Sequence, residues 1–310
     1  MPQKNIPVGR FAPTPSGRLH LGNLMCAMLA WLSAKSRGGK CVLRIEDLDA
    51  ARCPFMGENT KYMLDDLDWM GLSFDGDVLW QSQRSEIYAK YLNELEEKGL
   101  IYPCYCSRAE LHAASAPHLS DGVPLYDRKC LLRAQRGELP PVGRKPSFRV
   151  RVPDEDVCFT DILQGEYREN LDRECSDFVV RRSDGVYAYQ LAVVVDDALS
   201  GVNEIVRGND LLSSTPRQMY LQRLWGFAHP TYAHIPLLTD AAGRRLSKRE
   251  GDGCMERVRE VYTDARPVIG ALAAALGLIP SPESMTVEQL LPLFDWKKIP
   301  RDAVLLPEGF

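Results

Sequence analysis

The 310-residue sequence contains no apolar run that approaches the length of a membrane span, and its first residues, Met-Pro-Gln-Lys-Asn, lack the apolar core of a signal peptide. It has no internal repeat or low-complexity tract. Its nine cysteines are odd in number and lack the regular spacing of a disulfide framework. These absences argue against a membrane protein, a repeat array and a small disulfide-stabilised secreted domain. They predict a cytoplasmic protein with no membrane partner and a core large enough for one large domain or two unequal ones.

The net charge of −4 gives no sign of nucleic-acid binding, but the basic residues are unevenly distributed. Residues 128–151 contain eight lysines and arginines and a single acid, Glu138. Such a run is either an ordinary solvated face or a track that follows a phosphate backbone. The candidate track is formed by Arg128, Lys129, Arg133, Arg136, Arg144, Lys145, Arg149 and Arg151.

A loop rich in proline and glycine occupies residues 11–23 and ends in His20-Leu-Gly22, directly before an apolar helical segment. Pro13 stiffens the approach, whereas Gly17 and Gly22 permit close backbone contact with a ligand. The loop therefore delivers an imidazole and backbone N–H groups to a helix N-terminus, which favours an anionic phosphate. Alone, the same residues fit an ordinary turn and helix cap equally well.

The first hundred residues alternate between strand and helix patterns. Residues 40–45 form a short β-rich run, and residues 60–70 show an apolar stripe at helical spacing. A further helix is expected over residues 86–98, bounded by Ser85 and Gly99. This βαβα order predicts an α/β fold of Rossmann type, with a doubly wound parallel sheet and ligands at the carboxyl ends of its strands.

The pattern changes after residue 103, where Cys, Pro, His and Arg become frequent. We interpret the following stretch as a small insertion that splits the nucleotide-binding fold. Residues 186–195 and 204–206 are predicted strands of its second half, residues 213–216 begin a helix, and residues 258–278 form a helical tail. The predicted units are a first catalytic half (1–103), an inserted subdomain (104–180), a second catalytic half with a basic loop (181–250) and a C-terminal helical tail (251–310).

The basic loop of the second half reads Gly243-Arg-Arg-Leu-Ser-Lys248. Together with the His20 loop, and in the same order along the chain, it resembles the two signatures of class I aminoacyl-tRNA synthetases, His-x-Gly-His and Lys-Met-Ser-Lys-Ser. Asn23 stands at the second histidine, and Arg245-Leu246 stand at the Lys-Met pair.

Two intervening segments narrow the resemblance to the glutamyl and glutaminyl branch. They are Arg44-Ile-Glu-Asp-Leu-Asp49 and Glu204-Ile-Val-Arg-Gly-Asn-Asp210. The resemblance covers about residues 8–250 and implies a class I synthetase-like fold that activates an amino acid with ATP.

Amino acid activation requires that ATP be held and that the charge of the transition state be neutralised, mostly by positioning and electrostatics. The resemblance assigns this catalytic task to His20 and Lys248. Mg²⁺ is expected with ATP, but no dedicated protein ligand for it can be named. The implied ATP-binding residues are Pro13, Gly17, His20, Gly22, Asn23, Arg245, Leu246, Ser247 and Lys248.

The charged side chains of the sequence predict a pocket for the amino acid substrate. Arg10 and Arg207 offer guanidinium forks for carboxylates, Glu46 offers an anion for the α-ammonium group, and Tyr189 offers a hydroxyl. Each of these alone would be an ordinary structural ion pair or core tyrosine, whereas two arginines favour glutamate over glutamine. The resemblance implies that glutamate is bound by Arg10, Phe11, Ala12, Pro13, Thr14, Glu46, Tyr189 and Arg207.

Cys104-Tyr-Cys106 and Cys130 bring three thiols into the predicted insertion. On chemistry alone, His112 or His118 would complete a zinc site, and three reduced buried cysteines are the alternative. The resembling family has a Cys-x-Cys…Tyr-x-x-x-Cys arrangement, which Tyr126-Asp-Arg-Lys-Cys130 matches. It implies one zinc per chain held by Cys104, Cys106, Tyr126 and Cys130. The scattered cysteines are read as core or surface fillers: Cys26, Cys41, Cys53, Cys158, Cys175 and Cys254.

Only residues 249–310 follow the basic loop, too few for a sizeable anticodon-reading domain. The chain therefore resembles the glutamyl-queuosine tRNA(Asp) synthetases, truncated paralogues that activate glutamate without tRNA and attach it to queuosine in the wobble position of tRNA(Asp). The resemblance thus implies ATP, L-glutamate and tRNA(Asp) as partners of a protein expected to act as a monomer. The alternatives are a truncated conventional glutamyl-tRNA synthetase that charges a 3′ end, a nucleotidyltransferase of similar fold, and a non-catalytic tRNA-binding paralogue.

Overall fold

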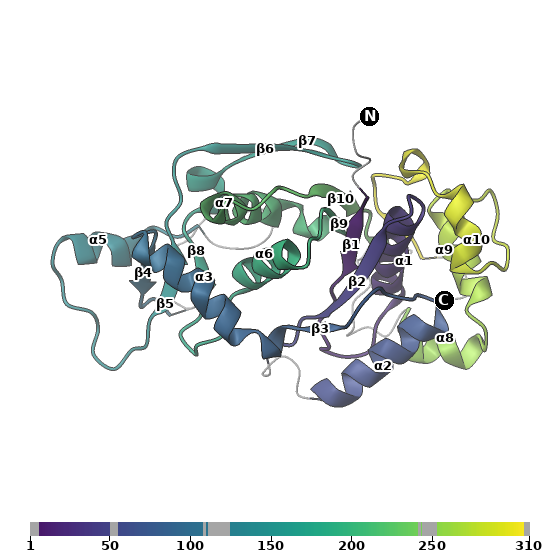
Figure 1. The fold of residues 1–310 in the computed structure, drawn as a ribbon, viewed down its shortest axis with the longest axis horizontal. Helices are drawn as coiled ribbons and strands as arrows, with labels where there is room; N and C mark the ends of the chain where they lie inside the picture. Colours follow the sequence, from purple (N-terminus) through teal and green to yellow (C-terminus); the bar gives the residue numbers. More distant parts are fainter. Residues whose placement is uncertain are drawn as a thin grey trace.

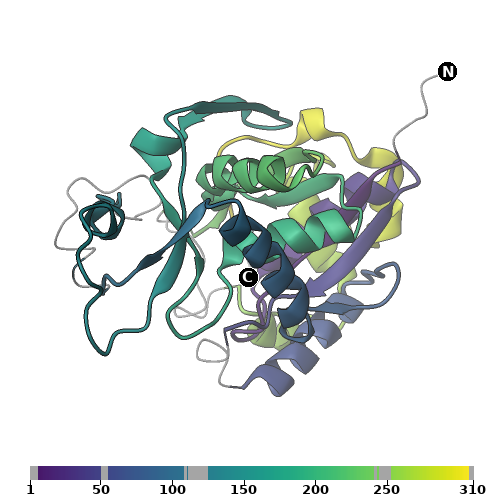
Figure 2. The same ribbon diagram turned by 60° about the vertical axis from the view of Figure 1, so that its left-hand side comes forward.

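The computed structural model describes residues 6–49, 55–107, 110, 125–240, 243 and 253–306. Parallel strands lie near the middle of the molecule in Figure 1, a smaller antiparallel sheet of β4, β5 and β8 (residues 101–104, 147–150 and 178–181) lies at one end of its long axis, and the helices α8, α9 and α10 (within residues 255–290) lie at the other. The turned view in Figure 2 shows the same antiparallel sheet apart from the parallel strands. In the described part of the chain no helix is both long and apolar enough to cross a membrane.

Five parallel strands carry the predicted α/β core. β1 pairs with β2 and β2 with β3, while β9 pairs with β10. The two groups adjoin where β1 lies beside β9, since Asn203 N–H donates to the Val8 carbonyl at 3.0 Å and Val8 N–H donates to Asn203 Oδ1 at 2.8 Å. The strands are β1 (Val8–Phe11), β2 (Lys40–Ile45), β3 (Leu79–Trp80), β9 (Glu204–Gly208) and β10 (Thr231–Ile235).

Helices flank these strands on both sides, as expected of a doubly wound sheet. α1 packs against β1, β2 and β9 and buries Leu24, Met28 and Leu32 completely. In Figure 1, α9 and α10 lie beyond α1, whereas α6 and α7 lie on the other side of the strands. The helices are α1 (Leu21–Lys35), α2 (Met56–Trp69), α3 (Ser85–Glu97), α6 (Tyr189–Leu199), α7 (Thr215–Trp225), α8 (Met255–Val261), α9 (Arg266–Ala275) and α10 (Val287–Leu290).

Between β3 and β9 the chain forms antiparallel structure. β5 pairs with β4 on one side and β8 on the other, and β6 and β7 form a hairpin. The antiparallel group consists of β4 (Ile101–Cys104), α5 (Lys129–Gln135), β5 (Ser147–Val150) and β8 (Phe178–Arg181), whereas the hairpin of β6 (Asp156–Asp161) and β7 (Gly165–Asn170) packs against β10 and α7. A change from parallel to antiparallel pairing is what an insertion would produce, although the predicted domain boundaries stay predictions. A short parallel pair, β11 (Leu238–Thr239) with β12 (Val304–Leu305), ties the C-terminal residues to the core.

One predicted element is wrong. The strand over residues 186–195 is the helix α6, whose Leu191 and Val193–Val195 are all buried. A helix buried on every side shows the same continuous apolar run as a buried strand, and packing overrides the β preference of three consecutive valines. The helical tail predicted over residues 258–278 contains two helices, because the chain leaves α8 at Val261 and starts α9 with Pro267 in its first turn.

Candidate active site

A cleft of about 640 Å³ opens at the carboxyl ends of β1, β9 and β10. The strand order reverses between β1 and β9, and ligands of open α/β sheets bind at such switch points. Most of the residues predicted to bind ATP or glutamate line this cleft. They are Arg10, Phe11, Ala12, Pro13, Thr14, His20, Gly22, Asn23, Glu46, Tyr189 and Arg207, joined by Ser16, Cys26, Asp210 and Leu211, which the sequence did not single out.

His20 lies immediately before α1, where the segment that begins at Gly253 meets it. Leu21 N–H donates to the Gly253 carbonyl at 2.8 Å, and Met255 N–H donates to the Leu19 carbonyl at 3.1 Å. These bonds form an isolated bridge between His20 and Cys254. Two segments more than two hundred residues apart in sequence therefore meet at one edge of the cleft.

The residue types at positions 22 and 23 are explained by the local structure around His20. A Cβ at Gly22 would lie 3.0 Å from two atoms of the His20 ring, so a side chain there would displace the imidazole. Asn23 Oδ1 accepts the His20 backbone N–H at 3.2 Å and so helps to begin α1. Gly17, which is absent from the cleft lining, has a φ of 152° that glycine adopts most readily.

Also in the cleft lining, Arg10 and Glu46 belong to a buried charge network. Arg10 Nε lies 3.4 Å from Asp197 Oδ1, and Arg44 bonds both Asp197 and Glu46, the latter at 3.2 Å. Burial raises the pKa of Glu46, although Arg44 and Arg10 act to lower it. A cation placed beside this carboxylate would offset the cost of its burial, as expected of a site for an ammonium group.

Arg207, at the end of β9, is 3% exposed and contacts only neutral acceptors in the described part of the chain. Its Nε–H donates to His234 Nε2 at 3.0 Å, Nη1 donates to Gln218 Oε1 at 2.7 Å, and Nη2 donates to Thr215 Oγ1 at 2.8 Å. A buried cation without a carboxylate partner is costly unless an anion binds it. The buried charge of Arg207 therefore favours a negatively charged ligand group beside it in the cleft.

The supporting carboxylates of α6 were not predicted. Asp196 accepts hydrogen bonds from Gln81 at 2.8 Å, Arg84 at 2.6 Å and Tyr88 at 2.7 Å. It is followed by Asp197, the partner of Arg10 and Arg44. Two consecutive acids after an apolar run could have indicated these supporting carboxylates. Because the run predicted a strand, the position of the acids near the end of a helix was not foreseen.

The antiparallel group holds a second cluster, formed by Cys104, Cys106, Cys130 and Tyr126. The three sulfur atoms lie within 4.8 Å of one another. The Tyr126 hydroxyl is 3.4 Å from the sulfur of Cys104 and 3.8 Å from that of Cys106. Burial opposes ionisation of Cys104, but the Tyr126 hydroxyl and the Arg149 guanidinium outweigh it and lower the pKa of this thiol to about 7. The cluster can hold a metal ion.

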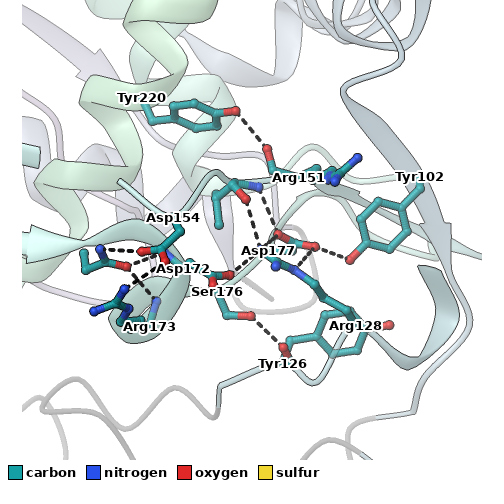
Figure 3. Close-up of polar contacts among 12 residues, drawn as sticks. Tyr102, Tyr126, Arg128, Arg151, Asp154, Asp172, Arg173, Ser176, Asp177 and Tyr220 are labelled. Carbon is teal, nitrogen blue, oxygen red and sulfur yellow. Dashed lines mark hydrogen bonds and ion pairs between the residues drawn. The ribbon is translucent and has the colours of Figure 1, made fainter. Parts of the chain in front are cut away.

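Asp177 anchors the chain around this cluster (Figure 3). Its carboxylate accepts hydrogen bonds from the Tyr102 hydroxyl at 2.6 Å, from Arg128 at 2.8 and 3.0 Å, and from Val152 N–H at 2.9 Å. Ser176 Oγ donates to the Tyr126 carbonyl at 2.7 Å. The tyrosine of the cluster is thereby joined to the end of β5 and the start of β8.

The arginines of the candidate basic track differ in exposure and in their partners. Arg149 is 7% exposed, stacks 4.0 Å from the centre of the Tyr126 ring and donates to the Asp177 carbonyl at 2.7 Å. Arg128 pairs with Asp177, so these two arginines are structural and do not form part of an exposed track. Exposed ion pairs are weak, and those that hold Arg133, Arg136 and Arg144 leave these side chains free to exchange partners.

Several predicted residues lie outside the described part of the chain. They are Arg245, Leu246, Ser247 and Lys248 of the basic loop, and His112 and His118, the alternative fourth ligands of the metal cluster. Their assignments stay predictions.

Comparison with known proteins agrees with this geometry. Residues 8–286 match the family described as tRNA synthetases class I (E and Q), catalytic domain. The chain is 47% identical to the Glutamyl-Q tRNA(Asp) synthetase of Symbiobacterium thermophilum over 96% of its own length and 95% of the relative. It is 46% identical to the protein of the same name from Geobacter sulfurreducens, over 89% and 86% of the two chains.

A crystal structure of a glutamate tRNA ligase from Elizabethkingia meningosepticum in complex with its amino acid shares the fold. Its TM-score is 0.78 at 23% identity, and the match covers 97% of this chain and 67% of that one. The chain therefore belongs to the class I tRNA synthetases of the E and Q group, and within that group to the glutamyl-Q tRNA(Asp) synthetases, a family of ligases.

Proposed function

We propose that the protein activates L-glutamate with ATP in the absence of tRNA and transfers the glutamyl group to queuosine in the wobble position of tRNA(Asp). In the first step an oxygen of the glutamate α-carboxylate attacks the α-phosphorus of ATP. The bond between the α- and β-phosphoryl groups breaks, and pyrophosphate leaves. In the second step a hydroxyl of queuosine attacks the acyl carbon, and AMP leaves.

The observation that carries the first step is that one cleft is lined by two different groups of residues. In the first group, Arg207 lacks a carboxylate partner among the described residues and lies in the same cleft as Glu46 and Tyr189. This arrangement suits the side-chain carboxylate and α-ammonium group of glutamate. In the second group, His20 lies before α1 next to the segment that follows the basic loop, which suits ATP phosphates. Mg²⁺ would accompany ATP through its phosphate oxygens.

In this scheme the residues of the protein act mainly by positioning the substrates and by stabilising charge. Arg10 and Arg207 hold glutamate so that its α-carboxylate points towards His20, and His20 and Lys248 stabilise the negative charge that grows on the phosphoryl oxygens. Glutamine lacks the side-chain charge that would balance Arg207. Aspartate is shorter by one methylene and cannot engage both ends of the pocket together.

We expect ATP–pyrophosphate exchange with glutamate, ATP and Mg²⁺ alone, because every group assigned to the amino acid comes from the protein. Exchange with glutamine or aspartate should be much slower at equal concentration. The measurement is incorporation of labelled pyrophosphate into ATP in the presence and absence of tRNA. A strict requirement for tRNA, or equal rates with glutamine, would contradict the proposal.

We further propose that the cysteine cluster is a structural zinc site. Ligands about 2.3 Å from a tetrahedral zinc lie nearly 4 Å apart. The Cys106 and Cys130 sulfur atoms are 3.4 Å apart, and the Tyr126 hydroxyl is 3.4 and 3.8 Å from two of the sulfurs, so the four donors fit with small adjustments. With four protein ligands the site would be closed and would stabilise the fold around Tyr126 without taking part in the reaction.

Metal analysis should find about one zinc per chain, and Cys106→Ser should lose it, since a serine hydroxyl is a poor replacement for a thiolate. Cys158→Ser is the matched control, because Cys158 is exposed and remote from the cluster in sequence. Tyr126→Phe should also reduce zinc content. If Tyr126→Phe keeps full zinc while His118→Ala or His112→Ala loses it, the fourth ligand is a histidine and our assignment is wrong.

A further inference from the structure

A buried chain of hydrogen bonds runs from the end of β6 through β10 to Arg207. His234 on β10 is completely buried, and its Nδ1 lies 2.6 Å from Asp161 Oδ2. Its Nε2 lies 3.0 Å from Arg207 Nε and 3.2 Å from the Thr215 hydroxyl. Neither His234 nor Asp161 is among the residues that line the cleft.

The direction of these bonds is fixed by chemistry. A guanidinium group has donors only, so His234 Nε2 must accept the Arg207 Nε–H, and the imidazole proton must reside on Nδ1. Asp161 accepts that proton and is itself held by the backbone N–H groups of Leu163 at 2.9 Å and Gln164 at 3.0 Å. The arrangement therefore permits one tautomer of neutral His234.

The neutral form is also the one that burial favours. The pKa of His234 is lowered because burial disfavours the imidazolium form; Asp161 opposes this shift, and the Arg207 cation adds to it. A protonated His234 would direct a second N–H against the Arg207 Nε–H. Asp161 and neutral His234 consequently present a lone pair to the arginine.

We propose that His234, held as its Nδ1–H tautomer by Asp161, is a positioning residue that sets the orientation of Arg207 and thereby the affinity for glutamate. This inference rests on the proposed function, in which Arg207 binds the amino acid. Three neutral acceptors hold the guanidinium plane, and His234 is the one that contacts Nε. Loss of that acceptor leaves Nε–H buried and unpaired and frees the plane to turn.

Three substitutions distinguish the effect of losing the hydrogen-bond acceptor from the effect of changing the side-chain packing. His234→Leu removes the acceptor, whereas His234→Gln keeps a side-chain oxygen that can accept the Arg207 Nε–H. Asp161→Asn keeps the volume of Asp161 but directs an amide N–H at His234 Nδ1, which forces the proton onto Nε2 and turns the lone pair away from Arg207. His229→Leu is the control for loss of a histidine, because His229 is exposed and bonds Gln222 at 2.7 Å.

The readouts are the KM values for glutamate and ATP in pyrophosphate exchange, the melting temperature, and the long-range ¹H–¹⁵N spectrum of the imidazoles. The chain has five histidines, so His234 can be assigned by substitution. We expect the Nδ1–H pattern in the wild type and the Nε2–H pattern in Asp161→Asn. The KM for glutamate should rise about 10- to 100-fold in His234→Leu and Asp161→Asn, the effect of losing a hydrogen bond to a charged group. It should rise less in His234→Gln and stay unchanged in His229→Leu, and the KM for ATP should stay within about twofold throughout.

The outcomes distinguish the inference from the function on which it rests. If the wild type exchanges with glutamate but the variants keep its KM, or if both KM values rise together in step with a falling melting temperature, His234 is only a core residue. An Nε2–H pattern in the wild type would also overturn the inference. A wild type without glutamate-dependent exchange would refute the proposed function itself, and with it the role given to His234.

Discussion

His20→Ala and Lys248→Ala should each lower the rate of glutamyl-adenylate formation by about two to three orders of magnitude, as is typical when one group that stabilises transition-state charge is removed. The expectation for His20 rests on its place before α1, beside the segment that follows the basic loop. Glutamate affinity should change little, because neither His20 nor Lys248 is assigned to the amino acid. The measurement is single-turnover adenylate formation at saturating substrates, with glutamate affinity determined separately.

Two further variants serve as controls for this test. His20→Asn removes the imidazole but supplies a favourable N-cap residue for α1, so a loss of rate in this variant cannot be attributed to a weakened helix start. Arg249→Ala removes the cation that directly follows the basic loop and should retain most of the rate. Near-normal rates in both alanine variants would refute the assignment of His20 and Lys248.

The sequence predicted the strands and helices whose ends carry turn or cap signals. Residues 40–45 are β2, and α7 begins within the predicted segment 213–216, with Pro216 in its first turn. The failure at α6 has a definite cause. Residues 191–197 of this helix are all buried, so they show no helical periodicity, and its two acids have meaning only once their partners Arg10, Arg44 and Arg84 are known.

The candidate site could be predicted as a set of residues but not as a geometry. Arg10, Glu46, Tyr189 and Arg207 line one cleft, as a shared site requires. Nothing in the sequence indicated that the acceptors around Arg207 in the described structure are all neutral, because Thr215, Gln218 and His234 come from α7 and β10 and approach it only in the folded chain. The same holds for Arg149, which a composition argument assigned to an exposed track and which in fact covers the Tyr126 ring.

The acceptor of the glutamyl group should be queuosine of the anticodon loop, and the effect of removing that nucleoside should be all or none. Relatives that are 46–47% identical over most of their length carry the name Glutamyl-Q tRNA(Asp) synthetase, which supports this acceptor. Single-stranded loops present unstacked bases that can enter a cleft, with their backbone held by exposed arginines such as Arg133, Arg136 and Arg144. A 3′-terminal ribose should then play no part in the reaction.

The most direct test of the account is to locate labelled glutamate after incubation of the protein with ATP and four forms of tRNA(Asp): with or without queuosine, and with or without the 3′-terminal adenosine. Periodate is unsuitable, because it destroys the diol of the terminal ribose and that of queuosine alike. We predict labelling of both queuosine-containing forms, irrespective of the terminal adenosine, and none of the forms that lack queuosine. Labelling that survives without queuosine and disappears when the terminal adenosine is removed would identify a conventional glutamyl-tRNA synthetase and contradict our account.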